Sequence, residues 1–215
     1  MTPRHHPSHA LILDHAAGTL DAGRSLIVGV HLASCAHCRV EVGLAEAVGG
    51  ALMAEASPAA LSPDALARAL AQIERPDPDP PKPPVAAPPA PKGWIRVPAE
   101  VSAAARRKRW AAPGVWVAPV AKGSGRQRSY LLGISAGMTL PLHTHRGEEL
   151  ICVLTGAYKD RGHVHHPGDF AENGEDVEHR SKIMGKEACV SLVCADGPLI
   201  PRDWVGRLFQ PLVGI

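Results

Sequence analysis

The chain has 215 residues, which suits two small domains, and its aliphatic residues suffice for two modest hydrophobic cores. Lysine and arginine (23 together) nearly balance aspartate and glutamate (21), so the overall charge favours neither nucleic acid nor a membrane as a direct partner. Five cysteines, an odd number, and no charged-then-apolar leader indicate a cytoplasmic protein with free thiols. The longest apolar stretch near the start, residues 26–33, is far shorter than the ~20 residues of a membrane span.

Helix signals follow one another through residues 1–75 without strand alternation. Ser8 is placed to cap a first short helix, and a second is expected to begin near Asp21. A third helix should continue past Cys38 to about residue 53. The sequence therefore predicts a small all-helical domain that is too small to depend on its own core alone, so a bound metal would help to hold it.

A fourth helix of about three turns is predicted to begin within residues 62–64, with Pro63 as its first residue. These residues, Ser-Pro-Asp, supply a cap, a proline at the first helical position and an acid in the first turn. Leu66, Leu70 and Ile73 then follow at i, i+4 and i+7, the spacing of one helix face. This apolar stripe either closes the domain's own core or docks into a partner's groove, and spacing alone does not distinguish the two.

The first of two groups of metal-ligand residues lies in this helical region. His31, Cys35 and Cys38 are spaced i, i+4 and i+7, so a continuous helix would project all three side chains from one face. A fourth ligand must come from elsewhere, and His6 can supply it. Other histidines are also within reach by spacing alone: His5, His9 and His15. Two histidines and two thiolates suit tetrahedral Zn²⁺ and leave no open position, which predicts a structural site.

Residues 76–92 read PDPDPPKPPVAAPPAPK, a composition that removes most backbone donors and cannot bury enough apolar surface to order itself. Such a segment favours extended polyproline II at ~3.1 Å per residue. We expect a semi-rigid linker that holds apart a helical domain, residues 1–75, and a second domain, residues 93–215. The two groups of metal ligands then belong to different domains.

From residue 115 onward the pattern changes to short apolar runs, VWVAPV, SYLLGI, ELICVL and ACVSLVC, which are separated by glycine and proline turns. Such runs are typical of an all-β sandwich or barrel. The predicted fold class is therefore multidomain α + β: a small all-helical zinc-binding domain followed by an antiparallel β-barrel.

The second group of ligands is His143-x-His145-x3-Glu149 together with His179. Residues i and i+2 of a strand face the same side, so both His143 and His145 are expected to point into the barrel. The next strand can return Glu149 to them, and a later strand can add His179. Glu148 would face the opposite way and is interpreted as a surface residue. Three imidazoles and one carboxylate accept Zn²⁺, Mn²⁺, Fe²⁺ or Ni²⁺ about equally well, so ligand type leaves the metal open.

The arrangement His6-x24-His31-x3-Cys35-x2-Cys38 resembles the zinc-binding anti-sigma domain of ChrR-type anti-sigma factors. The spacing around His143 is similar to the first cupin motif, and the same family carries a C-terminal cupin-like domain, so the resemblance covers the whole chain. It implies His6, rather than His5, as the first ligand. It further implies that the helical domain binds an extracytoplasmic-function sigma factor and occludes its surfaces for core RNA polymerase, with zinc needed for that binding.

Two functions compete. In the first, the helical domain silences a sigma factor, and the cupin-like domain senses an oxidant such as singlet oxygen, as ChrR-type proteins do, and relieves the inhibition. Cys152, Cys189 and Cys194 are then either oxidisable groups or simply buried strand residues. In the second, Fe²⁺ or Mn²⁺ in the barrel activates O₂ or a small substrate, but such an enzyme has no need of the helical domain. A DNA-binding zinc module is disfavoured by the lack of a basic face. We therefore predict a regulator and not an enzyme.

Overall fold

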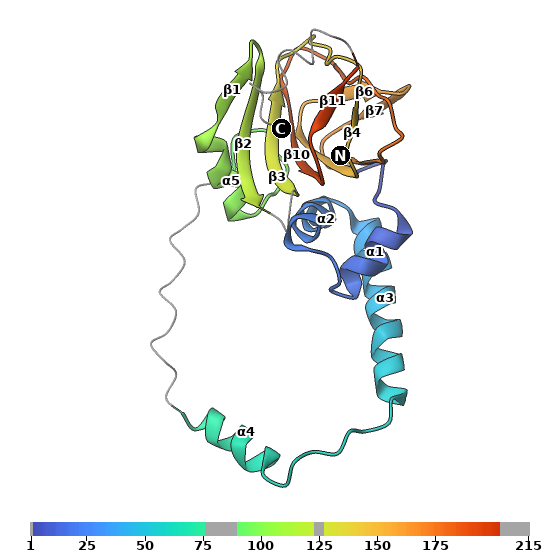
Figure 1. Ribbon diagram of the computed structural model, residues 1–215, viewed down its shortest axis with the longest axis vertical. Helices are drawn as coiled ribbons and strands as arrows, with labels where there is room; N and C mark the ends of the chain where they lie inside the picture. Colours follow the sequence, from blue (N-terminus) through green and yellow to red (C-terminus); the bar gives the residue numbers. More distant parts are fainter. Residues whose placement is uncertain (1, 76–89, 123–126, 203–215) are drawn as a thin grey trace.

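The computed structural model of the chain describes residues 2–75, 90–122 and 127–202 (Figure 1). Helices occupy the first part and strands the second, in the order that the sequence predicts, so the α + β fold class is confirmed. Most of the predicted linker, residues 76–89, lies outside the described residues. Within the described ranges, no helix combines the length and the apolar character that crossing a membrane requires.

The first part begins with three helices: α1 (His9–Ala16), α2 (Ala22–Ser34) and α3 (Ala36–Glu55). Ser8 caps α1 as predicted, and α2 begins after Asp21, which caps it. Ser8 Oγ accepts a hydrogen bond from the backbone N–H of Leu11, and the carboxylate of Asp21 accepts from the backbone N–H groups of Gly23 and Arg24. These bonds satisfy N–H groups that the start of a helix otherwise leaves unpaired.

Helix α4 (Ala65–Ile73) stands away from the other helices (Figure 1). It begins two residues later than predicted, because Ser62 does not cap it and instead accepts a hydrogen bond from the side chain of Arg68. No residue of α4 is buried, and Leu66, Leu70 and Ile73 are 71%, 51% and 79% exposed. The apolar stripe therefore does not close the core of the helical part.

The second part opens with the short helix α5 (Ala99–Ala104) and a 3₁₀ turn (Ala105–Arg107). The described strands are β1 (Arg109–Ala112), β2 (Val115–Lys122), β3 (Arg128–Ile134), β4 (His143–His145), β5 (Glu149–Thr155), β6 (Tyr158–Asp160), β7 (His163–His165), β8 (Phe170–Asn173), β9 (Lys182–Ile183), β10 (Cys189–Ala195) and β11 (Leu199–Pro201). All of them pair in the antiparallel sense.

The strands form three sheets rather than one closed barrel within the described residues. The largest has the order β1-β2-β3-β10-β5-β8, and the smaller ones are β7-β6-β9 and β11-β4. The smaller sheets cover one face of the large sheet (Figure 1). Alternate residues of β5 divide between the two faces, so that Ile151 and Val153 belong to the core between the sheets and Leu150 and Leu154 to the core on the outer face.

The outer face of the large sheet is covered by α2. Ile27, Val28 and Val30 of α2 are fully buried and share one hydrophobic core with Leu154 and Leu192 of the sheet. Each such side chain contributes about 1.5–3 kcal/mol when it is fully buried. The prediction that the linker holds the two parts apart is therefore wrong, because the buried side chains of α2 pack against the outer face of the sheet.

A polar network closes the edge of this contact. The guanidinium of Arg24 in α2 lies 2.8 Å from the carboxylate of Asp21, 2.8 Å from that of Asp196 and 3.3 Å from that of Glu148. Gln127 Nε2 donates a hydrogen bond of 2.8 Å to Asp21. Glu148, expected at the surface, is thus half-buried and holds the helical part against the sheet.

Candidate functional site

The four ligands predicted for the first metal site come together at the start of the chain. Sγ of Cys35 lies 3.4 Å from Nδ1 of His6, Sγ of Cys38 lies 3.3 Å from the same nitrogen, and Nε2 of His31 lies 3.3 Å from Sγ of Cys38. Bonds of ≈ 2.3 Å to sulfur and ≈ 2.1 Å to nitrogen in a tetrahedron place neighbouring ligand atoms about 3.6 Å apart. The cluster, buried except for the half-buried His6, has the dimensions of a closed metal site.

Cys35 is the residue at which the expected helix breaks. It lies between α2 and α3 with extended backbone angles, φ −112° and ψ 105°, so it ends one helix and caps the next. Its sulfur also accepts from the backbone N–H of Cys38 at 3.5 Å. The second and third helices are therefore separate, and the single helix face on which His31, Cys35 and Cys38 were expected to lie together is not formed. His31 occupies the last turn of α2 and Cys38 the first turn of α3, and the break brings them to the same point.

The second part of the chain orients one ligand of this first cluster. Nδ1 of His31 is 2.8 Å from the backbone carbonyl of Gly168, to which it donates, so Nε2 is left to face the sulfurs. Burial lowers the pKa of His31, which favours the neutral imidazole that a metal ion requires. Burial, together with the neighbouring thiol of Cys35, raises the pKa of Cys38 to about 12. A bound cation would offset the cost of ionising these buried thiols, because it pairs with the thiolates.

The second group of predicted ligands gathers between the sheets. His143 and His145 occupy β4, Glu149 begins β5, and His179 pairs with His143 through an isolated backbone bridge. Nε2 of His145 lies 2.8 Å from Nε2 of His179 and 3.1 Å from a carboxylate oxygen of Glu149. Ring centroids of His143 and His179 are 4.3 Å apart. All four side chains are at least 94% buried.

Three neighbours that the sequence did not reveal hold these ligands in place. Asp160 of β6 accepts a hydrogen bond of 3.0 Å from Nδ1 of His179, and the carbonyl of Pro141 accepts one of 2.8 Å from Nδ1 of His143. Asn173 Nδ2 donates to Glu149 at 3.2 Å. In both histidines the bonded Nδ1 leaves Nε2 for a metal, the arrangement in which outer-shell partners fix tautomer and ring orientation. Nothing in the local sequence around β6 marks Asp160.

The electrostatics of the group also suit a cation. Burial, and to a smaller degree the nearby His179, lower the pKa of His143 to about 4, so this imidazole is neutral near pH 7. Burial alone would raise the pKa of Glu149, but the hydrogen bond from His145 and the surrounding imidazoles outweigh it, and the pKa lies below its usual value. The centre therefore offers a neutral imidazole at His143 and an anionic oxygen at Glu149.

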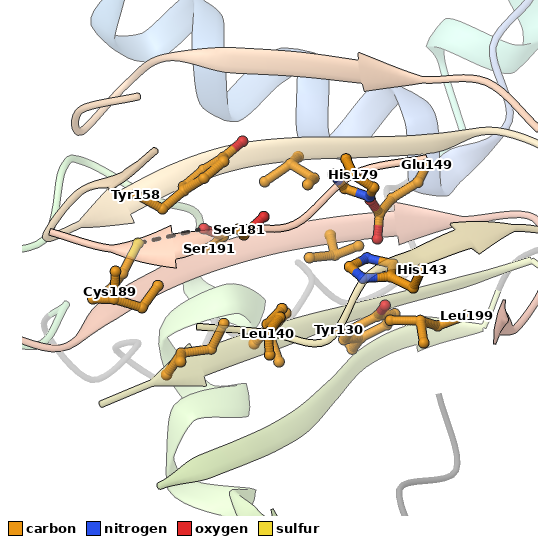
Figure 2. Close-up of a pocket in the computed structure, with 15 residues that line it drawn as sticks. Tyr130, Leu140, His143, Glu149, Tyr158, His179, Ser181, Cys189, Ser191 and Leu199 are labelled. Atoms are coloured by element: carbon orange, nitrogen blue, oxygen red, sulfur yellow. Dashed lines mark hydrogen bonds and ion pairs between the residues drawn. The ribbon is translucent and has the colours of Figure 1, made fainter. Parts of the chain in front are cut away.

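A cavity of about 30 Å³ adjoins the centre. Figure 2 shows His143, Glu149 and His179 at one end of it and Cys189 at the other, with Tyr158 on the wall. A water molecule needs roughly 10–15 Å³ of such space, so the cavity has room for a molecule of two or three heavy atoms. Burial raises the pKa of Cys189 to about 11, and burial likewise holds Cys152 and Cys194 as neutral thiols.

Comparisons with known proteins define the class and then the family. Residues 99–199 match the family described as the ChrR cupin-like domain, so the β-rich part is a cupin-like domain. The anti-sigma-E factor ChrR of Cereibacter sphaeroides is 36% identical over 220 residues, which is 100% of both chains. The chain therefore belongs to the ChrR family of anti-sigma factors. In the crystal structure of Rhodobacter sphaeroides SigE in complex with the anti-sigma ChrR, the matching chain is 33% identical with a TM-score of 0.72, covering 91% of this chain and 99% of that chain.

Proposed function

We propose that this chain is a cytoplasmic anti-sigma factor that binds and inhibits an extracytoplasmic-function sigma factor through its helices. Zn²⁺ held by His6, His31, Cys35 and Cys38 stabilises the helical part. The cupin-like domain holds Zn²⁺ or another divalent transition metal at its His/Glu centre, senses an oxidative signal such as singlet oxygen, and relieves the inhibition. The observation that carries this proposal is the apolar surface that α3 and α4 leave uncovered.

This surface lies on two helices. On α3, Val40, Leu44, Val48 and Leu52 recur every fourth residue, each is 61–65% exposed, and together they form one stripe along the helix. The exposed stripe of α4 adds a second apolar face. Folded proteins seldom expose contiguous apolar surface of this extent without a partner, and amphipathic helices commonly dock into grooves of other proteins. A sigma factor held between α3 and α4 would bury both stripes.

The first metal cluster supports this docking because it joins α2 to α3. Three of the four ligands lie on these helices or between them, and the fourth, His6, precedes α1. A cation bound there fixes the direction in which α3 leaves the sheet. Cys38 is the one buried residue of α3, so the cluster supplies the buried anchor of this helix beside its packing against α1.

The cupin-like domain is suited to sense a small molecule rather than to turn over a metabolite. Pockets for drug-sized ligands measure ≈ 300–1,000 Å³, whereas this cavity measures about 30 Å³. The metalloenzyme alternative therefore lacks room for an organic substrate. The bond between His31 and the carbonyl of Gly168 offers a direct route from this domain to the first cluster.

Binding of a sigma factor by the full-length chain tests the proposal. Leu44→Asp and Leu70→Asp each place a charge in the proposed surface, and each should weaken binding roughly 10- to 100-fold, the equivalent of one buried leucine. Leu13→Asp on α1, where the leucine is 57% exposed, is the matched control and should bind normally. Each variant is measured by co-purification with the host's extracytoplasmic-function sigma factors and by repression of transcription in vitro. Normal repression by both surface variants would reject the proposed surface.

A further inference from the structure

A third group of possible ligands lies where the N-terminal segment crosses the cupin-like domain. The backbone of this segment is fixed there: the N–H groups of Arg4 and His5 donate to Oδ1 of Asp169 at 2.6 and 3.2 Å. The N–H of Phe170 donates to the carbonyl of His5 at 3.0 Å. The side chain of His5 is thereby brought against strand β7, and it meets a histidine of that strand, His165.

His5, His165 and Asp169 place one ligand atom each within 4.8 Å of one another. The imidazole centroids of His5 and His165 are 4.4 Å apart, and Nδ1 of His5 lies 3.3 Å from Oδ2 of Asp169. His165 is 8% exposed and Asp169 only 1%. Nδ1 of both histidines is buried, yet neither makes a hydrogen bond of acceptable geometry within the described part of the chain. Buried polar atoms in proteins are nearly always satisfied. Nδ1 of His5 faces the carboxylate of Asp169, whereas Nδ1 of His165 requires a partner.

The carboxylate of Asp169 retains a lone pair for such a partner. Oδ1 accepts from two backbone N–H groups, whereas Oδ2 accepts from the N–H of His166 at 2.8 Å and lies 3.3 Å from Nδ1 of His5. The ring of His165 is stacked on Tyr158 at 4.7 Å with an angle of 12°, so its direction is fixed by packing. Both features fix the positions of the coordinating atoms before a metal ion binds.

We propose that His5, His165 and Asp169 form a third metal site, which takes a divalent transition metal such as Zn²⁺. Two imidazoles and one carboxylate are ligands typical of such ions. A fourth position is open to water or to a neighbouring imidazole, since Nδ1 of His166 lies 3.9 Å from Oδ2 of Asp169 and the ring of His163 lies 5.7 Å from that of His5. The site differs from the two described above because its ligands come from both parts of the chain.

The third site lies between the two groups of ligands described above. His5 directly precedes His6, a ligand of the first cluster, and Tyr158 lies on the wall of the cavity beside the second centre. An ion bound by His5 and His165 would fasten the N-terminal segment to β7 between those two centres. Separating the helical part from the cupin-like domain would then require that the ion be released or that one ligand be lost.

Metal titration of the full-length chain tests the site, with Co²⁺ as the probe under reducing conditions after removal of bound metal. Co²⁺ in the first cluster gives an intense thiolate charge-transfer band, whereas Co²⁺ held only by nitrogen and oxygen gives weak visible bands. His165→Phe keeps an aromatic ring against Tyr158 but removes the ligand nitrogen, and His5→Phe removes the ligand from the other part of the chain. His9→Ala, at an 88% exposed side chain, is the matched control.

We expect wild type and His9→Ala to bind one equivalent more than His165→Phe or His5→Phe, with the thiolate band unchanged in all four proteins. The double variant should lose that same single equivalent and no more, because both residues serve one ion. The proposal is overturned if His165→Phe binds as much Co²⁺ as wild type, or if the equivalent that it loses is the one that carries the thiolate band. The number of Co²⁺ equivalents bound and the thiolate band are both measured without a sigma factor, so neither depends on the proposed function.

Discussion

Gly168→Ala tests whether the turn before β8 holds the helical part in place. Gly168 has φ +92°, and a β-carbon there would lie 2.9 Å from Cγ of Pro3 and 3.4 Å from Cβ of Ser34. Positive φ costs a non-glycine residue about 1–2 kcal/mol. Both contacted residues belong to the helical part, so moving that part away relieves the collision, and the bond from His31 to the carbonyl of Gly168, worth about 1 kcal/mol, weakens with it. The expected loss for the docked state is about 2 kcal/mol or more.

Hydrogen exchange of residues 2–8, followed by mass spectrometry, measures this loss directly, because the N–H groups of Arg4 and His5 are bonded to Asp169 only while the segment is docked. A loss of about 2 kcal/mol should accelerate their exchange roughly 30-fold. Gly137→Ala is the control, since Gly137 has φ +74° and nothing within 4 Å of its would-be β-carbon. Unchanged exchange in Gly168→Ala, or equal acceleration in Gly137→Ala, would refute the reasoning.

Three further predictions concern the metal centres and the contact between the two parts. Cys35→Ser or Cys38→Ser should abolish metal binding at the first cluster and binding of the sigma factor with it, as measured by metal content and co-purification of the full-length chain. Asp160→Asn should weaken metal binding at the second centre by about 10- to 100-fold in a chelator competition, and an effect below about twofold would contradict the role given to this carboxylate. Burial works to raise the pKa of Asp21, but hydrogen bonds from Arg24 outweigh it and lower the pKa from 3.8 to about 2. The stability contributed by this depressed pKa is therefore fully present above pH 3.8 and is lost as the pH falls toward 2, and thermal melts of Asp21→Asn should show a smaller loss over that interval.

The two groups of metal ligands could be predicted from the sequence because most of their residues lie close together along the chain. His143 and His145 are two residues apart in a strand, which places both rings on one side whatever the rest of the fold does. The helix caps at Ser8 and Asp21 are local in the same sense. For the first cluster the spacing was informative although the geometry assumed for it was wrong, since a helix end, Cys35 and a helix start bring the side chains together as a single helix face would.

What the sequence did not reveal depends on contacts between distant segments. An apolar face such as that of α2 must be covered, but its pattern does not say by which surface, so the packing of Ile27 and Val28 on the sheet could not be predicted. Asp160 and the pair formed by His5 and His165 are similar cases. Each is an ordinary residue in its own segment and gains a role only when another strand or the N-terminus is placed against it.

The break at Cys35 allows α3 to turn as one rigid body about that residue. Its 20 residues, at 1.5 Å each, extend about 30 Å from the sulfur that both ends one helix and starts the next. A rotation of about 10° at this pivot carries the far end of α3 through about 5 Å, roughly one helical turn. A change too small to unfold anything near Cys35 would thus shift Leu52 out of register with a partner's groove while leaving Val40 nearly in place.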